Sequence, residues 1–197
     1  MTKLTVFSII LICFILLICF KIYNESSVFN LKCIVSNVNG KTYCVRERHK
    51  LEMAADLLAR TSQKLEKLVK YLDKTYPDRE NINRLVKGFN PDKISETLPT
   101  SEFTAYSENK GEKLAFCLNK TKNGKKLIDE NTLMFVALHE LSHIMTESVG
   151  HNQEFWKNFK FLLKNAKEIN IYVPVDYKKN NGHYCGMDLT DNPYYDL

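Results

Sequence analysis

The sequence lacks internal repeats, low-complexity tracts and any long run of basic residues. The excess of one charge over the other is also small, because 28 Lys and Arg residues are nearly balanced by 23 Asp and Glu residues, which gives a net charge of +5. The mild net charge and the absence of a long basic run argue against a dedicated nucleic-acid binder. With 44% hydrophobic and 26% charged residues, the chain as a whole is not disordered. With 197 residues, the chain has room for one domain with a core of ordinary size.

Charged residues are missing altogether from one segment near the N-terminus. Residues 4–20 read LTVFSIILICFILLICF, and every acidic residue follows Tyr23. A membrane span needs about 20 apolar residues, with a lower range near 17. A cleaved signal peptide is the alternative, but no small-residue cleavage site follows, and the apolar stretch is longer than a signal peptide usually has. We therefore favour a retained signal-anchor at residues 1–23, followed by a tether at 24–32.

The side of the membrane on which the domain lies is left open by the sequence. Lysines lie on both sides of the apolar segment, so the positive-inside rule does not decide. Four cysteines lie outside the segment, and they allow three pairings. Two glycosylation sequons, at Asn24 and Asn119, permit a luminal domain without requiring one.

A β-hairpin is expected at about residues 33–45, with Asn39-Gly40 as a two-residue turn. That turn places Val35 opposite Cys44 and Cys33 opposite Arg46. A disulfide between Cys33 and Cys44 would then need a bulge or a different register.

Hydrophobic periodicity predicts the remaining elements. Strands are expected at residues 103–107 and 113–119, and a loop at 90–101. The C-terminal tail, 171–197, is expected to be extended. Helices are expected at 47–76, 78–87, 133–147 and 152–169, the third capped by Asp129 or Asn131 and ended by Gly150. The pattern indicates an α+β domain at residues 33–197 with a small antiparallel sheet.

The third predicted helix contains the motif His139-Glu140-Leu-Ser-His143. Residues four apart share one face of a helix, so both imidazoles can reach one metal ion. Glu140 is rotated about 100° from His139, which places its carboxylate beside the ion as a proton acceptor for a metal-bound water. This HExxH pattern is the zincin signature, and it predicts one Zn²⁺ ion with Glu140 as general base.

A catalytic zinc needs a third protein ligand. His151 is favoured, because Gly150 can turn the chain back toward the helix. Glu154 is the alternative. Glu147 is disfavoured, because on a straight helix it lies about 12 Å from His139.

Other residues with chemical potential are expected to have ordinary roles. His49 and His183 are expected at the surface, and the aromatic residues of 155–163, Trp156 included, in the core. Tyr184 is a weaker candidate for a hydroxyl that stabilises an oxyanion. Met187 invites comparison with a Met-turn, although a single Met is weak evidence.

The segment HELSHIMTESVGHNQEFW resembles the HExxH…HxxxFW pattern of the WLM, SprT-like and YgjP-like minimal metallopeptidases. The resemblance covers about residues 114–163. It implies a zincin-like fold in which His139, His143 and His151 bind zinc and Glu140 is the general base. The domain also looks like WLM-type proteins encoded by large DNA viruses. The spacing from His143 to His151 is longer than in the shortest family versions, and the N-terminal span is a further departure.

The sequence thus predicts a membrane-anchored zinc metallopeptidase that hydrolyses peptide bonds of a protein or peptide substrate. The alternatives are a non-catalytic, membrane-tethered zinc-binding or interaction module and, with less support, a DNA–protein crosslink protease. We expect no specific nucleic-acid partner. The expected location is a viral envelope or an endomembrane, with a single pass at the N-terminus.

Overall fold

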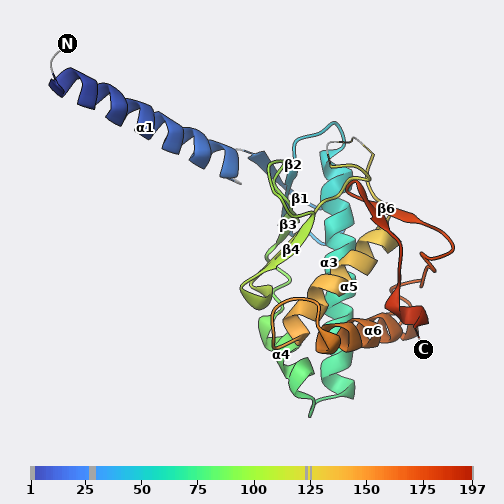
Figure 1. Ribbon diagram of the computed structural model, residues 1–197. Coiled ribbons are helices and arrows are strands. Elements are labelled where there is room, and N and C mark those ends of the chain that lie inside the picture. Colours follow the sequence, from blue (N-terminus) through green and yellow to red (C-terminus); the bar gives the residue numbers. More distant parts are fainter. Residues whose placement is uncertain (1–2, 27–29, 123, 125, 197) are drawn as a thin grey trace.

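The computed structural model describes residues 3–26, 30–122, 124 and 126–196, which form mixed α and β structure (Figure 1). Its strands are short and lie in small sheets, whereas its helices are long. The helices are α1 (Lys3–Glu25), α3 (Leu51–Thr75), α4 (Glu80–Gly88), α5 (Glu130–Met145) and α6 (Gln153–Glu168). The strands are β1 (Leu31–Val35), β2 (Thr42–Arg46), β3 (Ile94–Glu96), β4 (Ala105–Glu108), β5 (Lys113–Phe116), β6 (Gly182–Tyr184) and β7 (Met187–Leu189). The α+β class predicted from the sequence is confirmed.

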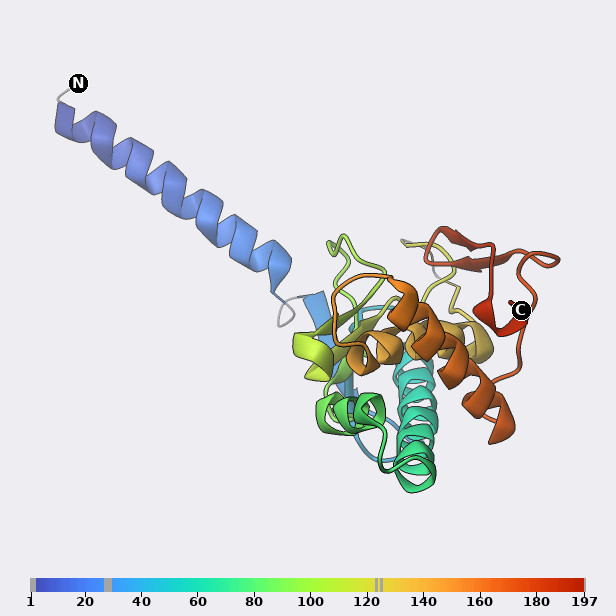
Figure 2. The ribbon, with the colours of Figure 1, turned by 60° about the horizontal axis from the view of Figure 1, so that its bottom comes forward.

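Helix α1 extends away from the rest of the molecule (Figures 1 and 2). Its segment Val6–Asn24 has a mean hydropathy of 2.8, and none of it is buried inside the protein. Among the described residues, this is the one helix that is long and apolar enough to cross a membrane. A helix that is apolar all round needs an apolar surrounding. The protein itself does not provide that surrounding for α1.

The central sheet has the strand order β3-β5-β4. Strand β4 is antiparallel to β5, whereas β3 is parallel to it, with Ile94 opposite Leu114. The predicted small antiparallel sheet is therefore correct for β4 and β5, and β3 makes the sheet mixed. The loop predicted at 90–101 contains β3, which the sequence pattern misses because the strand has only three residues and lies among turn formers. Strand β5 lies in the middle of the sheet, which explains why its residues from Leu114 onward are buried.

The N-terminal hairpin forms in a different register from the predicted one. Cys33 lies opposite Cys44, and the two residues form a disulfide. The loop is longer than two residues, because the Ser36 backbone N–H donates to the carbonyl of Lys41. The side chain of Asp56, on α3, accepts hydrogen bonds from the Ser36 hydroxyl and from the Asn37 backbone N–H. A contact with a distant helix therefore selects this loop.

Helix α5 is the centre of the body and contacts α3, α4, α6 and β4. Twelve of its sixteen residues are buried. Its N-terminus is fixed by Asp129, whose side chain accepts from the Thr132 backbone N–H, as one of the two predicted caps requires. It ends at Met145, before the predicted end at Gly150, because Thr146 already has an extended conformation (φ −86°, ψ 132°). The freed segment 146–152 becomes a loop beside the helix.

The C-terminal tail is more ordered than predicted. It contains the β6–β7 hairpin and packs onto α6 through its last residues. A second disulfide, Cys117–Cys185, links this hairpin to the end of β5. Asn119, part of a predicted sequon, is only 5% exposed, and its side chain accepts a hydrogen bond from Arg48. The folded chain therefore does not offer Asn119 as a glycosylation site.

Candidate metal centre

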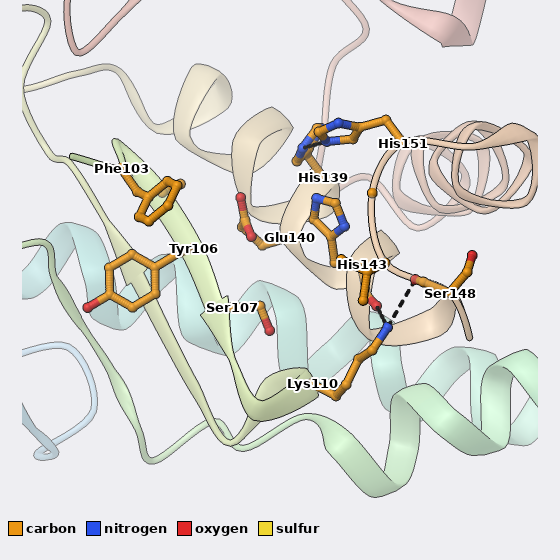
Figure 3. Close-up of a pocket in the computed structure, with 12 residues that line it drawn as sticks. Phe103, Tyr106, Ser107, Lys110, His139, Glu140, His143, Ser148 and His151 are labelled. Atoms are coloured by element: carbon orange, nitrogen blue, oxygen red, sulfur yellow. Dashed lines mark hydrogen bonds between the residues drawn. The ribbon is translucent and has the colours of Figure 1, made fainter. Parts of the chain in front are cut away.

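The predicted site residues lie together at the surface of α5 that faces β4 and the loop before α6 (Figure 3). His139, His143 and His151 each offer a ring nitrogen, and these three atoms all lie within 4.8 Å of one another. The Nε2 atoms of His139 and His151 are 3.0 Å apart. The helix accounts for the first two residues through their four-residue spacing. The third arrives by the turn of the chain after α5.

His151 reaches the helix because of two local features. Gly150 has φ +93°, in the region that glycine adopts more readily than other residues. Asn152 then begins α6, and its side chain accepts from the Phe155 backbone N–H. The buried Phe155 ring lies under all three histidines, with ring centroids 4.5–4.8 Å from each imidazole. Phe155 therefore supports the cluster from the core.

Two of the histidines are held in the neutral form. Burial and the neighbouring imidazoles lower the pKa of His139 to about 3. Burial, His151 and Lys110 together lower the pKa of His143 to about 4. At neutral pH both rings therefore keep a lone pair free for a metal ion, which is the form that metals bind.

Glu140 lies beside the histidines and not among the donors. Its side chain is buried, and burial raises its pKa to about 7, while a backbone hydrogen bond from Ser107 on β4 opposes the rise. A carboxyl group with a pKa near neutrality can both accept and donate a proton at pH 7. It lines a cavity of about 540 Å³ that also contains the three histidines. The other residues that line this cavity include Phe103, Ala105, Tyr106, Ser107, Lys110, Ser148, Val149 and Gly150.

The donor set fits a zinc ion. Nitrogen ligands at 2.0–2.1 Å in a tetrahedral arrangement lie roughly 3.3 Å from one another. The 3.0 Å separation of the His139 and His151 nitrogens is close to that value. All three nitrogens lie within 4.8 Å of one another, so a bound ion would draw the most distant pair closer together. Three imidazoles also match the ligand set of zinc sites that keep a fourth position open.

The alternative ligands are directed elsewhere. Glu154 pairs with Arg84 at 3.0 Å and accepts from the backbone N–H of Glu147. Glu147 is turned toward the same arginine, at 3.9 Å. Arg84, on α4, also donates to the carbonyl of Met145. These contacts hold both carboxylates away from the imidazoles.

The other residues considered from the sequence lie outside the cluster. His49 is exposed, and His183 is exposed with its ring 2.6 Å from Asp188. The Tyr184 hydroxyl is committed to the carbonyl of Thr104, so it is not directed at the cavity. Met187 is 47% exposed on β7.

The prediction that Trp156 is a core residue is wrong. Its side chain is 46% exposed, and its ring lies 5.9 Å from the His151 ring. On α6 the neighbouring Phe155 and Phe159 take the buried positions, and Trp156 falls on the rim between the core and solvent. The helical periodicity predicts the buried face of α6, but it does not show that Trp156 lies at the edge of that face.

Sequence reasoning also missed Lys110. This residue follows β4, and its ammonium lies 2.8 Å from the carbonyl oxygen of Thr146, in the loop that leads to His151. The contact joins positions 36 residues apart, and the acceptor is a backbone atom. No side-chain motif could have predicted it.

Comparison with known proteins connects this site to a family. The model of the WLM domain matches residues 46–194. Protein R325 of Acanthamoeba polyphaga mimivirus is 31% identical over 169 residues, which cover 81% of this chain and 82% of R325. Protein 042R of Invertebrate iridescent virus 3 is 34% identical over 84 residues, 42% of this chain and 50% of 042R. Among solved structures, Wss1 from Saccharomyces cerevisiae matches with a TM-score of 0.48 and 19% identity, covering 64% of this chain and 87% of that one.

Proposed function

Because the chain belongs to the WLM family, we propose that it is a zinc-dependent metallopeptidase anchored to a membrane by α1. The observation that carries the proposal is the convergence of three imidazoles beside a buried carboxyl group with a pKa near 7. A site that only stabilised the fold would not need a proton acceptor at that position. The domain limits follow the sequence prediction, with a span at residues 1–23 and a peptidase domain at 33–197.

His139, His143 and His151 would hold the zinc ion. When bound, zinc supplies Lewis acidity, which activates water and polarises the scissile carbonyl. Glu140 accepts a proton from the attacking water and returns it to the leaving amine. The Ser107 backbone contact orients the Glu140 carboxyl group toward the cavity.

The substrate would lie along β4. Strand β5 has neighbours on both sides, so it has no free edge for an extended substrate. Strand β4 is an edge of the sheet. The Thr104 carbonyl points to β5, where it accepts from the Cys117 N–H, whereas the Ser107 backbone points to Glu140. An extended peptide added at this free edge would pass over the histidines and form backbone hydrogen bonds with the protein.

Two disulfides support a location for the domain. Disulfides persist in oxidising compartments and are rare in the cytosol. Cys33–Cys44 and Cys117–Cys185 both lie after α1, whereas Cys13 and Cys19 are free within it. We infer that the peptidase domain faces the oxidising side of the membrane. The same argument weighs against a DNA–protein crosslink protease, because such an enzyme needs access to DNA in a compartment where disulfides are rare.

Metal content and peptide hydrolysis together test the proposal. The purified full chain should contain one zinc ion per molecule, and His143→Ala should contain much less. Glu140→Gln should keep the zinc and lose hydrolysis of an unfolded protein substrate. A parent protein without zinc would refute the metal centre. Zinc without any hydrolysis across a peptide library would favour the non-catalytic module.

A further inference from the structure

Lys110 bonds to several backbone carbonyls in the loop between α5 and His151. The ammonium of Lys110 lies 2.8 Å from the carbonyl oxygen of Thr146 and 3.2 Å from those of Glu147 and Ser148 (Figure 3). A fourth carbonyl, of His143, is at 3.4 Å. These carbonyls come from the end of α5 and the residues after it, where a helix leaves acceptors without partners. The C-terminal end of a helix also carries partial negative charge, which attracts a cation.

The backbone of Lys110 is itself fixed in place. It has a left-handed conformation (φ 55°, ψ 44°) in the turn Asn109–Gly111 between β4 and β5. This turn packs against the end of α4 so tightly that a side chain on Gly111 would start 2.6 Å from the carbonyl oxygen of Gly88. The Gly111 carbonyl in addition accepts from the Asn90 backbone N–H. The ammonium therefore extends from a rigid base.

The loop that receives the ammonium has other supports at its start: Asn158 donates to the Thr146 hydroxyl, Glu154 accepts from the Glu147 backbone N–H, and Asn152 donates to the Ser148 hydroxyl. The residues just before His151 are the open part of the loop. Val149 is 91% exposed, and Gly150 has open space around its α-carbon. His151 itself is exposed, whereas His139 and His143 are fixed by the helix. Of the three imidazoles, His151 is thus the one whose place depends on a loop. Asn152 anchors the other end of that loop at the start of α6.

We propose that Lys110 is a positioning residue that sets the metal affinity of the site by fixing the loop of His151. The proposal rests on the metal centre proposed above. Without the ammonium, four carbonyls lose a shared donor, and the loop can move His151 away from the other two rings. Removing a residue that orients a metal ligand typically lowers metal affinity by about 10- to 100-fold.

Lys110 lies in the turn that begins right after β4, so the turn next to the free strand edge also contacts the loop of the third histidine. A peptide that pairs with β4 and an ion that binds the imidazoles would therefore stabilise the same arrangement. We expect zinc to bind the parent more tightly when an uncleaved peptide occupies the strand edge, and this coupling to be weaker in a Lys110 variant.

The test compares zinc affinity of the full chain in detergent with that of Lys110→Met, using a competing chelator. The matched control is Lys113→Met, because Lys113 lies on the same hairpin and pairs with Glu108 at 3.7 Å, away from the loop. We expect a 10- to 100-fold weaker zinc affinity in Lys110→Met and parental affinity in Lys113→Met. Circular dichroism of the metal-free proteins sets a temperature at which all three are folded.

The absorption spectrum of the cobalt(II) form provides a readout that a general loss of stability would not change. It reports the number and geometry of the ligands, so the spectrum of Lys110→Met should differ from the parent's while that of Lys113→Met should not. If Lys110→Met does not fold, Lys110→Gln, which keeps two N–H donors without the charge, takes its place.

Equal zinc affinity and equal cobalt spectra in the parent and the Lys110 variant would overturn this inference and leave the proposed function intact. A parent that binds no zinc would overturn both. These two results are distinguishable because the first requires a parent that binds the metal.

Discussion

Helices α1 and α5 are both apolar on all sides, but α1 is exposed and α5 is buried. Both are rich in apolar residues on all sides, and neither has a separate polar face. The side chains from Val6 to Tyr23 of α1 are exposed, whereas most of α5 is buried in the body. Apolar composition alone therefore indicates only that a helix avoids water. The polar residues decide what else it does, since α5 carries His139, Glu140 and His143, and residues 4–20 carry no charged side chain.

Glu140→Gln should produce the largest effect, because it removes the buried proton acceptor that distinguishes α5 from α1. We expect peptide hydrolysis to fall by about 10²- to 10⁴-fold, the usual contribution of a general acid–base group. Zinc content, measured by elemental analysis, should remain one ion per chain. Substantial remaining hydrolysis would contradict the role of Glu140.

Matched leucine truncations in the two helices should differ strongly. Leu138 on α5 is fully buried, so Leu138→Ala should reduce the free energy of unfolding of the body by about 2–5 kcal/mol. Leu11 on α1 is 47% exposed, and Leu11→Ala should change the free energy of unfolding of the body by less than about 0.5 kcal/mol. Denaturant unfolding of the full chain in detergent measures both. Similar losses would mean that α1 packs on the body.

The buried histidines of α5 should make the metal-free protein sensitive to acid. The folded pKa values of His139 and His143, about 3 and 4, lie below the ordinary value of 6.5 that applies in the unfolded chain. Between pH 6.5 and 4, the unfolded chain therefore binds up to two protons that the folded chain does not, and stability falls as the pH falls. Glu140 acts in the opposite direction, because its folded pKa is raised to about 7. Between pH 7 and 4.5 the folded chain binds up to one proton at Glu140 that the unfolded chain does not, which raises stability as the pH falls.

The net result is a thermal midpoint that decreases as the pH is lowered from 6.5 to 4. Each kcal/mol lost should lower the midpoint by about 2–4 °C in a chain of this size. Differential scanning calorimetry in the presence of a chelator measures this slope. The double variant His139→Gln, His143→Gln should have a shallower slope, and an unchanged slope would show that other groups cause it.

Deleting residues 1–23 should have the smallest effect on the folded body. Because α1 is not buried against the body, the midpoint of thermal unfolding should stay within about 2 °C of the parent's. The protein should move from the membrane fraction to the supernatant, which sedimentation of cell extracts measures. Continued sedimentation with membranes would place the attachment elsewhere.

The parts of the structure that the sequence predicted are those that depend on local spacing. The positions of His139 and His143 follow from helical periodicity, and Gly150 correctly indicated the turn that brings His151 to them. The family resemblance, which rested on the same residues, is confirmed by the match to the WLM model.

The parts that could not be predicted depend on contacts between distant segments. Strand β3 pairs in parallel with β5, and three residues give no periodic signal. The hairpin register depends on Asp56, which lies on another element. Lys110 contacts backbone carbonyls, which have no side-chain identity to detect. In each case the residue that determines the local structure is distant in the sequence and becomes a neighbour only when the chain folds.

Trp156 is the chain's single tryptophan, and it lies half exposed against the ring of His151. The tryptophan fluorescence of the protein therefore originates at the edge of the candidate metal centre. Binding of a quenching ion such as cobalt(II), movement of the His151 loop, or arrival of a peptide should each change that emission without any added label. The molecule carries its own optical reporter at the place where its chemistry is proposed to occur.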